Sequence, residues 1–189
     1  MDQAEGKLGG WVYRKEIIEF IVASKEYCYL LSQEGEGIEL DKVHRLLSLV
    51  YTKFLVCEEH IESCYTVEEG LGDQIPDLPV PLSQEQYYEL LKRVEAKLPE
   101  EESMGGQGLE QGGTIGAPRE GEPLAELLCD IYQPLYDCLI NYSTGDELSM
   151  GVGLKDCYKN FYNYFGSIIL KVFSRLLEEH GGIDEDTDI

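Results

Sequence analysis

The amino-acid sequence predicts an all-α protein, an irregular bundle of about five helices whose two C-terminal helices form a central antiparallel pair. Apolar residues recur three and four positions apart over several long segments, which is the spacing of amphipathic helices. Glycine and proline separate these segments, and no segment alternates apolar and polar residues as a half-buried strand does. We therefore expect one helical domain over residues 1–189, with its core at about 13–98 and 123–178.

The first two helices follow a loose lead-in that ends at about residue 11. The apolar stripe from Tyr13 to Leu31 predicts the first helix, which Gly35 and Gly37 then stop. A second stripe predicts a helix from about Leu40 to Ile61, with Asp41 as its N-cap.

A proline-rich segment precedes the third helix. Residues 66–82 contain three prolines in six positions, so we expect an extended loop that Val80 and Leu82 anchor to the core. The sequence Ser83-Gln84-Glu85-Gln86 is a capping box, and it predicts a helix that begins at Ser83 and ends before Pro99.

Residues 99–122 are rich in glycine and glutamate and carry few large apolar side chains. Such a segment gains too little burial to offset the entropy of ordering it. We interpret it as a flexible insertion within the domain, because the helices on either side need each other.

The last two helices form the expected central pair. The fourth begins near Pro123 and stops at Gly145, and Pro134 inside it predicts a kink. A glycine-bearing stretch, 146–153, leads into the final helix, whose wide apolar face runs from Leu154 to Leu177. Residues 181–189 are expected to be a disordered acidic tail.

The charge of the chain excludes two classes of partner. Asp and Glu number 37 against 15 Lys and Arg, a net charge of −22, and the basic residues form no run. Nucleic acid and anionic membrane surfaces both need a basic footprint, so we expect neither as a partner. No apolar run reaches the roughly 18 residues of a membrane span, and the polar N-terminus lacks a signal sequence. The six cysteines occur singly, which indicates reduced thiols in a cytoplasmic protein.

The sequence contains no convincing catalytic, cofactor or metal motif. A di-iron bundle needs Glu-x-x-His, but Cys57 precedes His60 by three and Leu177 precedes His180 by three. Cys57 and His60 could touch on one helix face, yet an orienting third group is missing, so a packed thiol is the preferred interpretation. The glycines between 105 and 113 lack phosphate-loop spacing. We therefore expect no catalytic residue, no metal and no cofactor.

Thirteen tyrosines are the remaining candidates for function. Most are expected to bound the core, with buried rings and hydroxyls that reach water or carboxylates, but an exposed tyrosine patch would suit protein binding. The leading hypothesis is a non-catalytic cytoplasmic module that binds an unidentified protein partner. Its surface is predicted at Glu26, Tyr27, Asp130, Tyr132 and Tyr164. The alternatives are an enzyme or small-ligand binder whose carboxylates converge only in three dimensions, and a structural homo-oligomer.

The stretches DIYQPLYDCL (130–139) and GLKDCYKNFYNYFG (153–166) resemble a bacterial family known only as a domain of unknown function. That family has an Asp-Ile-Tyr-x-x-Leu helix, a glycine turn, and an aromatic-rich helix followed by glycine. The first three predicted helices are also similar to it, so the resemblance covers about residues 13–178 apart from the 99–122 insertion. In the family a tryptophan is common where Phe165 stands, and Pro134 interrupts a helix that the family continues. The resemblance implies an all-helical fold and no activity.

Overall fold

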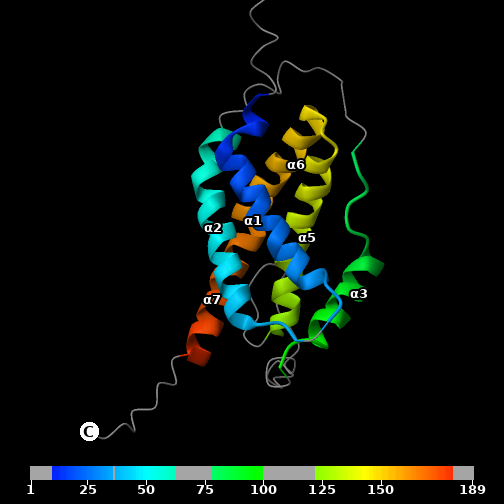
Figure 1. The fold of residues 1–189 in the computed structure, drawn as a ribbon, viewed down its shortest axis with the longest axis vertical. Coiled ribbons are helices and arrows are strands. Elements are labelled where there is room, and N and C mark those ends of the chain that lie inside the picture. Colours follow the sequence, from blue (N-terminus) through cyan, green and yellow to red (C-terminus); the bar gives the residue numbers. More distant parts are fainter. Residues whose placement is uncertain (1–9, 36, 63–77, 100–121, 181–189) are drawn as a thin grey trace, which may run out of the picture.

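The chain folds as an all-α bundle, which confirms the fold class predicted from the sequence. The computed structural model describes residues 10–35, 37–62, 78–99 and 122–180, and these residues contain helices, turns and no strand (Figure 1). A short 3-10 helix, η1 (Gly10–Tyr13), comes first. The longer elements are α1 (Lys15–Ser32), α2 (Leu40–Glu62), α3 (Gln84–Glu95), α5 (Leu124–Ser143), α6 (Glu147–Asn160), the π-helix η3 (Phe161–Phe165) and α7 (Gly166–His180).

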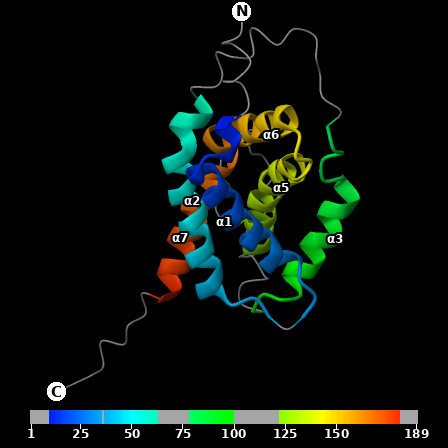
Figure 2. The same cartoon turned by 45° about the horizontal axis from the view of Figure 1, so that its top comes forward.

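Helix α5 lies at the centre of the packing. It contacts α1, α3, α6 and α7, and its most extensive contact is with α6. Helices α1 and α2 pack against each other as a pair, α7 lies beside α2, and α3 covers the outer side of α5 (Figure 2). A helix in this position needs an apolar surface on several sides, and α5 buries nine side chains along its length.

The core is one cluster of buried side chains to which all these elements contribute. Its aromatic part joins α2 to the C-terminal segment, where Phe54 stacks on Phe161 with ring centroids 3.8 Å apart. Phe20 of α1 meets the same Phe54 ring edge-on, at 5.6 Å. Because Phe161 begins the π-helix, this aromatic contact ties the irregular turn to the middle of the bundle.

The C-terminal helix differs from the prediction at its start and in its middle. Residues 147–153 belong to α6 and do not form a connecting stretch, because Asp146 caps the helix by accepting the Ser149 N–H at 2.9 Å. At Phe161–Phe165 the helix widens into one π turn, and the Gly166 N–H bonds back to the Phe161 carbonyl. A Cβ atom at Gly166 would lie 2.6 Å from that carbonyl oxygen, so the closed π turn requires glycine.

Several local predictions are confirmed. The capping box is complete: Ser83 accepts from the Gln86 N–H and the Gln86 side chain accepts from the Ser83 N–H. Gly145 has φ of +71°, the left-handed conformation expected after the last turn of α5. Leu82 packs against the core as predicted.

Other local predictions are wrong. Val80 is 85% exposed and anchors nothing. Asp41 is the second residue of α2, not its N-cap, and it pairs with Arg45 one turn on. Helix α3 ends at Glu95, before the expected boundary. The end of the lead-in, Gly10–Tyr13, is helical and buries Val12 against the bundle.

Two of the predicted segments lie wholly or mostly outside the described residues. The structure describes only the two end residues of the 99–122 insertion, and residues 181–189 lie outside the described part of the chain. Helix α5 runs as one helix through Pro134, and the expected kink stays a prediction.

Candidate functional site

A groove between α1 and α5, which we call the α1–α5 groove, is an apolar hollow among the described residues. It has a volume of about 470 Å³, within the range of about 300–1,000 Å³ that ligand sites occupy. Both helices contribute large side chains to it. Its walls include Ile21, Lys25, Tyr29, Tyr132, Tyr136 and Leu139.

Tyrosines give this groove an aromatic surface with polar edges. Tyr132 is buried, at 6% exposure, and its ring stacks on Tyr136 with centroids 5.5 Å apart. Tyr29 stands at the opposite wall with 57% of its surface exposed. At one end Tyr142 donates a 2.8 Å hydrogen bond to the carbonyl of Val12, which fixes η1 beside the groove. Such rings offer large contact areas at low entropic cost.

A second feature, the tyrosine–aspartate cluster, consists of Tyr87, Asp130 and Tyr164. The Tyr87 hydroxyl donates to Asp130 Oδ1 at 2.6 Å, and the Tyr164 hydroxyl donates to Asp130 Oδ2 at 2.5 Å. Both carboxylate oxygens therefore accept a short charge-assisted bond. The cluster joins α3, α5 and η3, since the π turn carries Tyr164.

The protonation of the two tyrosines defines what the cluster can do. Burial and the hydrogen bond to Asp130 raise the pKa of both Tyr87 and Tyr164. Phenols with raised pKa values stay protonated at neutral pH and act as fixed donors. The cluster is therefore suited to holding three elements together and poorly suited to proton abstraction.

A third feature, the α5–α6 pocket, lies where the extended residues 78–82 cross α5 and α6, and it has a volume of about 430 Å³. Asp137 and Asp156 both line it. Asp137 accepts the Leu82 N–H at 2.8 Å, and burial raises the pKa of this carboxyl group. The side-chain oxygen of Asn141, another lining residue, is buried without a hydrogen-bond partner in the structure.

Close helix packing forms one wall of the α5–α6 pocket. A Cβ atom at Gly153 would lie 2.5 Å from Asn141 Cβ and 3.3 Å from the Cys138 carbonyl oxygen. Glycine at this position therefore lets α6 approach α5 closely. Cys138 and Cys157 both line the pocket.

The isolated buried thiols lack the environment of a nucleophile. Burial raises the pKa of Cys57 to about 12 and has the same effect on Cys129. The Cys57 thiol donates a hydrogen bond to the Phe54 carbonyl oxygen at 3.3 Å. His60 faces a different group, with its Nε2 atom 3.8 Å from Glu16 Oε2. These contacts support the packed-thiol interpretation of Cys57, because a reactive cysteine needs an electropositive setting.

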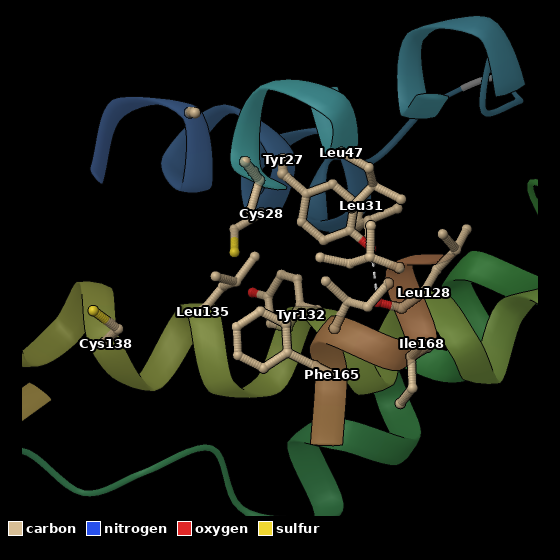
Figure 3. Close-up of a cluster of buried hydrophobic side chains, with 14 of the residues drawn as sticks. Tyr27, Cys28, Leu31, Leu47, Leu128, Tyr132, Leu135, Cys138, Phe165 and Ile168 are labelled. Carbon is tan, nitrogen blue, oxygen red and sulfur yellow. Dashed lines mark hydrogen bonds between the residues drawn. The ribbon is translucent and has the colours of Figure 1, made fainter. Parts of the chain in front are cut away.

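The predicted surface residues do not form one surface. Tyr27 is fully buried and donates a 2.9 Å hydrogen bond to the Leu128 carbonyl (Figure 3), while Glu26 is exposed on α1. Asp130 and Tyr164 do meet, in the tyrosine–aspartate cluster. Tyr132 belongs to the α1–α5 groove instead.

Sequence reasoning missed the partners that complete these features. Tyr87 supplies one of the two donors to Asp130, and its place in the sequence predicts only a helix. Asp137 holds Leu82 on α5 by accepting its backbone N–H, and the sequence does not indicate this contact. Both lie on helices with ordinary spacing, so the sequence carries no signal for either role.

Within residues 10–35, 37–62, 78–99 and 122–180, no group of three or more His, Cys, Asp or Glu side chains is arranged to hold a metal ion. None of the helices in these ranges combines the length and apolarity needed to cross a bilayer.

The profile of the family described as Domain of unknown function (DUF5063) matches residues 12–179. The chain is similar in structure to protein BF1032 from Bacteroides fragilis, a structural genomics target, with a TM-score of 0.63. The two share 22% sequence identity over 89% of this chain and 97% of that chain, a likeness that concerns the fold alone. No curated protein matches the chain.

Proposed function

Because the chain belongs to the DUF5063 family, a domain of unknown function, we propose a function from its own geometry: a non-catalytic module that binds another protein. The α1–α5 groove carries this proposal. It is wide enough for the side chains of a peptide segment, and its walls are mostly apolar and aromatic. Tyrosine-lined, partly exposed hollows are typical of protein-binding surfaces.

The chemistry of the polar groups supports binding over catalysis. In the tyrosine–aspartate cluster, the raised pKa values of Tyr87 and Tyr164 keep both phenols protonated. Burial likewise raises the pKa of Cys28, Cys57 and Cys129. General acid–base and nucleophilic catalysis both need groups whose pKa lies near the working pH.

Charge complementarity defines the partner. With a net charge of −22, the chain attracts basic proteins over a distance set by the ionic strength. The groove itself has apolar walls, so we propose a partner segment with apolar anchor residues and basic flanks. We place this interaction in the cytoplasm, since the five cysteines of the described residues are free thiols of the kind found in reducing compartments.

The test is affinity capture from native lysate with two matched variants. Tyr29→Glu adds a charge at the wall of the groove, and Tyr88→Glu adds the same charge on α3, at 51% exposure against 57% for Tyr29. An unrelated protein of similar net charge reports generic basic binders. The proposal expects a specific partner that the wild type and Tyr88→Glu capture and Tyr29→Glu loses. Equal capture by both variants would show that the groove is not the interface.

A second candidate function is ligand binding in the α5–α6 pocket. Its supporting observation is the convergence of Asp137 and Asp156 on one hollow with the unpartnered oxygen of Asn141. A thermal-shift screen with small amines and metal ions tests it. A ligand that stabilises the wild type and not Asp137→Asn would support this candidate, and no stabilisation by any compound would count against it.

A further inference from the structure

Helix α1 carries an exposed apolar ridge beside the α1–α5 groove. Ile18, Val22 and Tyr29 are 43%, 53% and 57% exposed, and their spacing of one and two helical turns places them on one face of α1. We call these three side chains the α1 ridge. Helix α1 lies at the front of the bundle, and none of the described helices covers this face (Figure 1, Figure 2). The ridge adjoins the groove, because Tyr29 belongs to both.

The groove differs in charge from the chain as a whole. The chain has 37 Asp and Glu residues and a net charge of −22, yet none of the described residues that line the groove carries a carboxylate. The one charged side chain among these lining residues is that of Lys25. Two copies of a strongly acidic chain repel each other where their carboxylates meet. The groove is therefore a surface that a second copy can approach with little local repulsion.

We propose that the α1–α5 groove of one copy takes the α1 ridge of a second copy of this chain, while the reverse contact forms at the same time. The inference rests on the proposed function and names the partner of the same site. A ridge and a hollow side by side on one face complement a second copy of themselves across a two-fold axis, as the interface of a symmetric dimer requires. Ile18 and Val22 enter the groove of the partner copy and pack against its apolar and aromatic walls.

The α1 ridge has the chemistry proposed for the partner segment, which is apolar anchors with basic flanks. Ile18 and Val22 are the anchors, and the exposed residues Arg14 and Lys15 precede them. The Lys15 side chain is 82% exposed, and its ammonium group lies 3.6 Å from a Glu19 carboxylate oxygen on the same helix. Such an exposed pair contributes little to the fold, so this lysine is available to a partner. The chain itself thus supplies a segment of the kind that the groove suits.

Ionic strength separates this dimer from a complex with a basic protein. Salt screens the repulsion between two copies that each carry a net charge of −22, and it leaves the apolar contacts in place, so the dimer should tighten as salt is added. The attraction between this acidic chain and a separate basic protein weakens under the same conditions. The two kinds of partner therefore give opposite salt dependences.

The experiment is sedimentation equilibrium of the full chain at a series of protein and salt concentrations. We expect the wild type to reach twice the mass of one chain and to associate more tightly at higher salt. Val22→Glu on the ridge and Tyr29→Glu at the groove wall each place two carboxylates in the symmetric interface, so each should weaken the dimer at least about 100-fold. Tyr88→Glu, which adds the same charge on α3, should dimerise like the wild type. A wild type that stays monomeric, or a dimer that Val22→Glu leaves unchanged, would overturn the proposal.

A measurement on the wild type alone guards against variants that fail to fold. An amine-reactive label should modify Lys25, which lines the groove, more slowly as the protein concentration rises, while exposed Lys92 on α3 reacts at a constant rate. A rate at Lys25 that does not depend on concentration would refute the dimer. If the wild type stays monomeric while Tyr29→Glu, unlike Tyr88→Glu, loses a partner captured from lysate, this inference fails and the proposed function stands. If Tyr29→Glu loses neither a partner nor the dimer, both fail.

Discussion

The hydroxyl group of Tyr27 donates a 2.9 Å hydrogen bond to the carbonyl oxygen of Leu128, a residue 101 positions further along the chain. Tyr27 is fully buried, so this bond forms away from water and pins α1 to α5 (Figure 3). A buried phenol needs such a partner, since an unsatisfied hydroxyl in an apolar core costs free energy. Tyr27 therefore stabilises the wall on which the α1–α5 groove is built.

Replacement of Tyr27 by phenylalanine removes the hydroxyl and keeps the ring. We expect the free energy of unfolding to fall by about 1 kcal/mol, the typical net value of one hydrogen bond. Urea unfolding followed by circular dichroism measures the change. The control is Tyr29→Phe on the same helix, where 57% exposure predicts a change within about 0.5 kcal/mol. Equal effects of the two substitutions would mean that the Tyr27–Leu128 bond contributes nothing.

Alkaline pH should unfold the protein through its buried phenols. Burial raises the pKa of Tyr27, and Tyr87, Tyr132 and Tyr164 are shifted in the same direction. A group whose pKa is higher in the folded state than in the unfolded state favours folding below the unfolded value, which is about 10 for tyrosine. Cys28, Cys57 and Cys129 are shifted in the same direction, and the unfolded value for cysteine is about 8.5. Stability should therefore begin to fall above about pH 8.5 and fall further above about pH 10. Phenolate absorbance and circular dichroism are recorded over the same pH range, and we expect these tyrosines to ionise at the pH at which the helices unfold. Ionisation of these tyrosines while the circular dichroism stays that of the folded chain would contradict the prediction.

Asp130→Asn tests the tyrosine–aspartate cluster. The substitution removes the charge that strengthens both hydrogen bonds and leaves one acceptor oxygen, so we expect a loss of about 1–2 kcal/mol in the free energy of unfolding. A double-mutant cycle with Tyr164→Phe isolates the pair. A coupling free energy of about 0.5 kcal/mol or more is expected for residues in direct contact. If the two losses in the free energy of unfolding simply add, the hydrogen bond between Asp130 and Tyr164 does not stabilise the fold.

Gly166→Ala tests the π turn. The new Cβ atom would lie 2.6 Å from the Phe161 carbonyl, so the turn must open or the helix must shift, at a cost of about 1–3 kcal/mol. Thermal and urea unfolding measure the loss. Gly10→Ala is the matched control, because a Cβ atom there meets nothing within 4 Å. A stable Gly166→Ala protein would show that the π turn relaxes to a regular helix without loss.

Local sequence signals decided the positions of most elements. The capping box at Ser83 and the stop at Gly145 depend on groups within one turn of each other, so short-range patterns predict them. The glycines of 146–153 indicate a connecting stretch, whereas the Asp146 side chain caps a helix that begins at Glu147. The sequence therefore predicts the start of α6 too late. The π turn at Phe161–Phe165 was also missed, since an aromatic helical segment shows no sign of an extra residue per turn.

The all-α class, the helical segments and the large negative charge therefore follow from the sequence. The docked helices decide that the Tyr27 hydroxyl bonds to Leu128, that Asp130 accepts hydrogen bonds from Tyr87 and Tyr164, and that Cys138 and Cys157 line one pocket. The reason is physical. Periodicity and capping arise from interactions within a turn or two of helix, whereas these contacts join residues on different helices and exist only once the helices have docked.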